Sequence, residues 1–157
     1  MKRNLSIFLQ AVTILIGVGV LGLMLWEPHL EGRNAHATLS EIYFHDPFLA
    51  YAYAASIFFF VALYQTVKLL GFLGRKEAFS ERSMKALRTI KYCAMALAVS
   101  IVAAQCYLFI LVRDSDDVAG GAVMSLFLLL VAATIAIVAA VFQRRVQNAL
   151  NQIQVNP

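Results

Sequence analysis

The sequence contains few charges: Asp, Glu, Lys and Arg make up 14% of its 157 residues, whereas soluble domains carry about 25%. Apolar residues make up 61%, and the mean hydropathy is +0.75. A soluble domain of this length could not bury so much apolar surface, because small folded domains leave a large share of their area exposed to water. The shortage of charge therefore excludes an ordinary soluble domain and indicates a lipid environment.

Cysteine is also scarce, since the chain contains only Cys93 and Cys106. The two residues lie 13 positions apart on one predicted helix, which separates them by about 20 Å, too far for a disulfide between them. Neither belongs to a CxxC pair. These counts exclude a disulfide framework and a CxxC-type redox or metal site.

Long stretches lack charge altogether and predict an all-α integral membrane protein. About 20 apolar residues cross the hydrocarbon layer as a helix, and lipid requires every backbone polar group to be satisfied within the segment. We expect a four-helix bundle forming a single domain over residues 1–157. The charge-free windows are Leu5–Trp26, Phe48–Val67, Tyr92–Val112 and Val118–Gln143. The predicted spans lie at about 5–26, 48–70, 90–112 and 118–143, with an outer loop at 27–47 and a cytoplasmic loop at 73–89.

The charges divide between the two ends of these helices. Eleven of the 13 basic residues lie on the side that carries both termini, and seven of the nine acidic residues lie on the other side. Because loops rich in Lys and Arg stay in the cytoplasm, both termini are predicted to be cytoplasmic. The first span is too long for a typical signal peptide, and we expect it to stay uncleaved. The sequence pI of about 9.3 then reflects bases at anionic lipid headgroups and not direct nucleic-acid binding.

Small residues predict how the helices meet, because in lipid they allow close backbone approach. Gly17 is expected to admit a neighbouring helix, and Gln65 and Gln105 are each expected to form a hydrogen bond across a helix interface. The third and fourth spans, joined by a short turn, are expected to pack through two small-residue stripes. These stripes are Cys93, Ala96, Ser100, Ala103 and Ala104 in the third span, and Gly121, Ala122, Ser125, Ala132, Ala136, Ala139 and Ala140 in the fourth.

The cytoplasmic loop has clear signals of local order. Ser80 is a good N-cap, so the third helix should begin near Glu81 and enter lipid near Tyr92. We predict headgroup or partner contacts for the bases of this region. They are Arg75, Lys76, Arg82, Lys85, Arg88 and Lys91.

Two motifs resemble enzyme signatures but lie in the wrong context. GVGVLG, residues 17–22, has the glycine pattern of a dinucleotide-binding turn, yet it lies in the middle of the first span. DSDDV, Asp114–Val118, resembles the aspartate motif of haloacid-dehalogenase-type enzymes, but the chain lacks the large α/β domain that such chemistry needs. We therefore expect no enzyme activity, no catalytic residue and no cofactor.

Ionisable side chains are missing from the central part of every span, which argues against an ion-coupled pump or carrier. All three histidines, His29, His36 and His45, lie with Glu41 in the outer loop. Their spacing matches no standard metal site, so no metal is predicted.

Three segments resemble the bacterial membrane family called domain of unknown function 2975. They are FFFVALYQTVKLL (58–70), EAFSERSMKALRTIKYCA (77–94) and AAVFQRRVQNAL (139–150). The resemblance implies a small four-span protein of the bacterial cytoplasmic membrane with no assigned activity. It also implies genes for helix-turn-helix regulators nearby, and hence a sensor or a sequestering partner.

The leading functional hypothesis is a non-enzymatic membrane protein that acts as a regulatory or partner-binding module. The expected partners are the lipid bilayer with its anionic headgroups and either a cytoplasmic regulatory protein or further copies of the chain. The alternative is a subunit of a transporter or channel assembly, which would form a stable stoichiometric complex.

Overall fold

The computed structural model describes residues 3–30, 47–111 and 118–155, and these residues form four helices. The helices are α1 (Arg3–Leu30), α3 (Pro47–Gly74), α4 (Glu81–Leu111) and α5 (Val118–Val155). Each is long and apolar enough to cross a membrane, which confirms the prediction of an all-α protein with four membrane-length helices. The outer loop predicted at 27–47 is shorter than expected, because residues 27–30, with His29, belong to α1 and Pro47 begins α3. Its residues 31–46, with His36 and His45, and Asp114–Asp117 lie outside the described residues.

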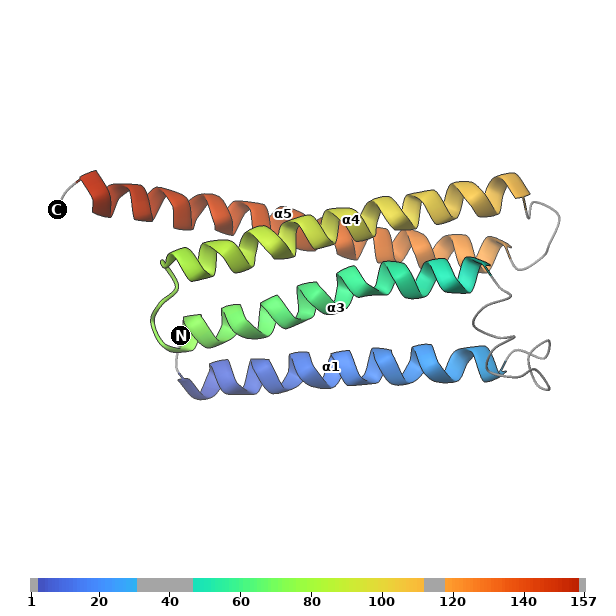
Figure 1. The fold of residues 1–157 in the computed structure, drawn as a ribbon, viewed down its shortest axis with the longest axis horizontal. Helices are drawn as coiled ribbons and strands as arrows, with labels where there is room; N and C mark the ends of the chain where they lie inside the picture. Colours follow the sequence, from blue (N-terminus) through green and yellow to red (C-terminus); the bar gives the residue numbers. More distant parts are fainter. Residues whose placement is uncertain (1–2, 31–46, 112–117, 156–157) are drawn as a thin grey trace.

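The helices run alongside one another, and the ends of α1, α3, α4 and α5 that carry most of the basic residues lie at the same end of the molecule (Figure 1). We call this end, which includes both chain termini and the turn at 75–80, the basic end. Helix α5 has 38 residues, which corresponds to about 57 Å of helix, well beyond the roughly 30 Å of a hydrocarbon layer. Its last turns therefore extend past the predicted span at the basic end.

Extensive contacts among the described residues join α1 to α3, α3 to α4, and α4 to α5. The predicted bundle is therefore open and follows chain order, and it is less compact than expected. In lipid an apolar helix face gains as much from acyl chains as from another apolar helix. For that reason no hydrophobic driving force brings α1 and α5 together.

Helix α4 contacts both α3 and α5, and its buried residues lie along one side. Ser83, Leu87, Ile90 and Ala94 are buried in steps of four and three residues, and Ala86 is buried beside them. Alternation of this kind averages 3.5 residues, which keeps one seam facing a partner helix. The predicted small stripe of α4 was therefore only partly right, and Ala103 is exposed.

On α5 the predicted small-residue stripe agrees better with the buried residues than it does on α4. Ala132, Ala139 and Val146 are buried at intervals of seven residues, and two of them belong to the predicted stripe. A groove of alanines on one helix accepts larger side chains from the other, so small residues are not needed on both sides.

Polar side chains at membrane depth join neighbouring helices. The amide of Gln105 on α4 donates to the hydroxyl of Ser125 on α5, as the sequence predicted. The hydroxyl of Tyr53 on α3 donates to the carbonyl of Met24 on α1. Gly17 lies against Leu63 of α3, where a Cβ atom would be 3.5 Å from Leu63 Cδ2. The neighbouring helix expected at Gly17 is present, but a Cβ atom would be in ordinary van der Waals contact there, so the approach does not require glycine.

Candidate functional site at the basic end

The predicted contact residues all lie at the basic end, on the turn after α3 and the first turns of α4. Arg75, Lys76, Arg82, Lys85 and Arg88 are exposed. Lys91, the residue nearest the membrane, is half-buried, and its Nζ lies 4.8 Å from the centre of the Tyr92 ring. A cation over an aromatic ring at this distance is attracted by the ring quadrupole, which holds the ammonium at the level of the headgroups.

The turn after α3 is a Schellman cap, which fixes the direction of the chain. The N–H of Glu77 donates to the carbonyl of Phe72 at 2.9 Å, and the N–H of Lys76 donates to the carbonyl of Leu73 at 3.3 Å. Lys76 has φ 64°, the left-handed conformation that this motif requires and that glycine normally supplies. The backbone of Lys76, a charged and exposed residue, is therefore strained.

The start of α4 is equally well defined. The N–H of Ser83 donates to Oγ of Ser80 at 3.2 Å, which confirms Ser80 as the N-cap and Glu81 as the first helical residue. Ser83 is fully buried, and its own hydroxyl donates to the carbonyl of Glu77 at 2.9 Å. Two serines therefore tie the turn to the helix, and the basic residues on either side are held on an ordered scaffold.

The bases of α4 occupy the half of the helix that does not pack. At 100° per residue, Arg82, Lys85 and Arg88 lie about 60° apart on one side, and the buried Leu87 and Ile90 lie on the other. The three-residue spacing winds around the helix, but the winding stays within the exposed half. The result is a broad cationic surface on the exposed half of α4.

The sequence interpretation gave little weight to three arginines at this end, which form two pairs: Arg144 with Arg145, and Arg3 with the predicted Arg75. Arg144 and Arg145 are exposed on α5 and directly precede Val146, which is fully buried. Arg3 on α1 and Arg75 after α3 line one common pocket. Only the order in which the helices pack reveals the second pair, since the two arginines are far apart in the sequence.

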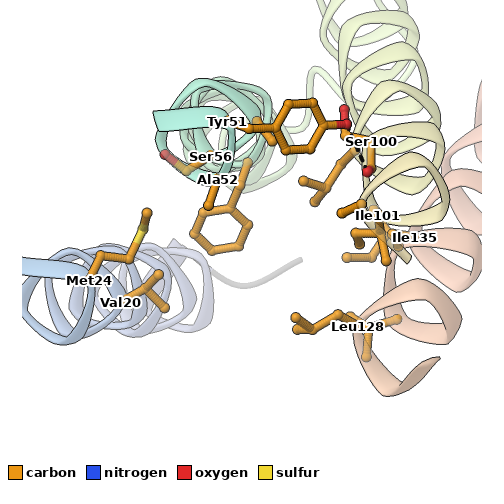
Figure 2. A pocket seen from close by; sticks show the side chains of 15 residues that line it. Val20, Met24, Tyr51, Ala52, Ser56, Ser100, Ile101, Leu128 and Ile135 are labelled. Carbon is orange, nitrogen blue, oxygen red and sulfur yellow. Dashed lines mark hydrogen bonds between the residues drawn. The ribbon is translucent and has the colours of Figure 1, made fainter. Parts of the chain in front are cut away.

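A different feature lies at membrane depth, toward the other end of the helices. A cavity of about 380 Å³ is lined by residues from all four helices, among them Val20 and Met24 of α1, Tyr51 of α3, and Leu128 of α5 (Figure 2). The hydroxyl of Tyr51 donates to the carbonyl of Ser100 at 2.8 Å, so its polar atom is already satisfied. The remaining surface is almost wholly apolar and suits hydrocarbon, not a polar substrate.

Four membrane-length helices joined by polar contacts define a small multi-pass membrane protein. Residues 32–153 match the family model described as Protein of unknown function (DUF2975), and the chain belongs to this family. It is also similar to the uncharacterized membrane protein YoaS of Bacillus subtilis (strain 168), with 34% identity over 152 residues, or 96% of this chain and 94% of that protein. No solved structure matches the chain. The family resemblance predicted from the three sequence segments is confirmed.

Proposed function

We propose that this protein is a non-enzymatic component of the bacterial cytoplasmic membrane whose basic end docks a soluble regulatory protein with an acidic surface. In this proposal both termini are cytoplasmic. The excess of Lys and Arg at the end that carries the termini supports that orientation. The membrane helices then serve to hold the basic end at the inner surface of the membrane.

The observation that carries the proposal is the ordered cationic surface formed by the turn at 75–80 and the exposed half of α4. Lys85 and Arg88 extend from a capped helix, and Lys76 extends from a hydrogen-bonded turn. Binding to a scaffold that is already ordered costs less backbone entropy than binding to a loop that must fold first. Complementary charge on a partner would speed encounter and fix its orientation.

The polar groups at membrane depth also support a non-enzymatic role. The side chains of Tyr51, Tyr53 and Gln105 each form a hydrogen bond to a neighbouring helix. These polar groups therefore serve helix packing.

A pull-down from the cytosol of the source bacterium tests the docking surface, using the full chain in lipid nanodiscs. The test variant is Lys85→Gln with Arg88→Gln, and the matched control is Arg144→Gln with Arg145→Gln, which removes the same charge from α5. We expect one soluble protein whose recovery falls about tenfold with the test variant, a change of roughly 1.4 kcal/mol in binding free energy, and stays unchanged with the control.

Equal recovery from the wild type and both variants would contradict the proposal. Recovery of an integral membrane protein in fixed stoichiometry would instead favour the second candidate, a subunit of a transporter or channel assembly. The open packing of α1, whose extensive contacts are with α3, leaves a face for such a subunit.

A further inference from the structure

A small pocket lies between α1 and α3 at the basic end. Its volume is about 310 Å³, at the lower end of the range for small-ligand sites. The pocket lies where the first turns of α1 meet the last turn of α3. Its lining consists of Arg3, Ser6, Ile7, Gln10, Gly71, Gly74 and Arg75.

Two side chains of α1 fix the shape of this pocket. The hydroxyl of Ser6 donates to the carbonyl of Leu70 at 2.5 Å, and the amide of Gln10 donates to the carbonyl of Val67 at 3.0 Å. Ser6 is 2% exposed, so this contact is well packed. The two bonds, one helical turn apart, hold α1 against α3 without any ligand.

Glycine in α3 makes this close approach possible. A Cβ atom at position 74 would lie 2.5 Å from Ser6 Oγ, and one at position 71 would lie 2.9 Å from Gln10 Nε2. Real Cβ atoms do not approach other atoms so closely. Position 74 therefore requires glycine or a shift of α1, because Ser6 Cβ would lie only 2.7 Å away, whereas at position 71 the end of the Gln10 side chain would have to move. The floor of the pocket is thus built into the packing of the two helices.

The charges around the pocket favour an anion. Arg3 and Arg75 are its only charged lining residues among those that the structure describes, and both are exposed. Arg3 lies in the first turn of α1, where the helix dipole adds partial positive charge. A guanidinium group forms paired hydrogen bonds with phosphate oxygens, and two such groups can hold one phosphate from both sides.

Four carbonyls near the end of α3 already accept hydrogen bonds. The hydroxyl of Ser6 donates to the carbonyl of Leu70, the N–H of Arg75 lies 3.2 Å from the carbonyl oxygens of both Gly71 and Phe72, and the N–H of Lys76 donates to the carbonyl of Leu73. The end of the α3 dipole corresponds to about half a negative charge, which the two full positive charges of the arginines outweigh.

We propose that this pocket binds a phosphate group between Arg3 and Arg75. The candidate membrane segments of α1 and α3 reach Arg3 and Gly74 respectively, which places the pocket at the level of lipid headgroups. The phosphate belongs either to an anionic lipid or to a soluble phosphate compound, and both present the same oxygens to the two guanidinium groups. This site does not depend on the docking of a soluble protein.

Native mass spectrometry of the purified full chain tests the site without any cytosolic protein present. Three preparations are compared: phosphatidylcholine nanodiscs, nanodiscs that also contain phosphatidylglycerol, and phosphatidylcholine nanodiscs with inorganic phosphate added. The test variant is Arg3→Gln with Arg75→Gln, and the control is Arg144→Gln with Arg145→Gln, two exposed arginines outside the pocket lining. Both variants leave the Ser6 and Gln10 contacts intact, and thermal unfolding checks that they fold.

We expect the wild type and the control to retain one phosphatidylglycerol or one phosphate ion, and the test variant to retain about tenfold less. Retention of the lipid alone identifies a headgroup site, whereas retention of inorganic phosphate in the preparation without anionic lipid identifies a site for soluble phosphate. Either result supports the site. Loss of retention to the same extent in the control, or no retention by the wild type in any preparation, would overturn it.

Discussion

Lys76 is the one described residue other than glycine with a positive φ, and its backbone is strained for that reason. Replacing it with glycine removes the clash between Cβ and the backbone, so Lys76→Gly should stabilise the fold by about 0.5–1 kcal/mol. Lys76→Val should destabilise it, because a β-branched side chain tolerates this conformation poorly. Thermal unfolding in mild detergent measures both shifts. If Lys76→Gly instead lowered the unfolding midpoint below that of the wild type, the lysine side chain would stabilise the fold by more than its left-handed backbone conformation destabilises it.

At the scale of single residues, local rules predicted the contacts of Ser80 and Gln105. Ser80 was identified as an N-cap because a serine hydroxyl directly before a helix accepts a backbone N–H of its first turn. The bond from Gln105 was expected because a strong polar group in lipid needs a partner. The contacts of Ser6 and Gln10 with α3 were not predicted, since their acceptors are backbone carbonyls 64 and 57 positions away. No side-chain pattern marks such an acceptor.

At the scale of helices, the packing of α4 against its neighbours α3 and α5 sets how much volume a buried position tolerates. Ala94 is 4% exposed on the buried seam of α4, whereas Ala103 on the same helix is exposed. The change Ala94→Leu should therefore destabilise the protein by about 1–3 kcal/mol through overpacking. The matched change Ala103→Leu should stay within about 0.5 kcal/mol. Unfolding midpoints and gel-filtration profiles in detergent compare the two, and equal effects would mean that this seam is not the packed interface.

The same packing shows why helix positions were easier to predict than helix faces. Apolar length and the N-cap located the helices, because both signals lie within one segment. The face of α4 was only partly predicted, since small residues were expected on both partners, yet Leu87 and Ile90 fill the seam. Which large residue enters a groove depends on the partner helix, and that information is not local.

At the scale of the whole molecule, the packing order was the part that the sequence did not predict. Every helix is apolar on several sides, so hydropathy does not distinguish a lipid-facing surface from a helix-facing one. The pairing of Arg3 with Arg75 across one pocket follows from the contact between α1 and α3. The list of bases predicted for the basic end omitted Arg3, because it rested on closeness in sequence.

The orientation of the whole molecule in the membrane gives the last prediction. Both termini and the turn at 75–80 lie at one end (Figure 1), so labelling at a single position of that turn reports the side of all three. In a variant whose two native cysteines are replaced by alanine, Lys76→Cys should resist an impermeant maleimide in intact cells and react after permeabilisation. The companion variant His36→Cys, in the predicted outer loop, should react in intact cells. The expected reason is that the basic loops stay with the cytoplasm, while the acidic loops cross the membrane. The reverse labelling pattern would place the basic end outside, where it could not meet a cytoplasmic partner, and would exclude the proposed docking while leaving the phosphate pocket untouched.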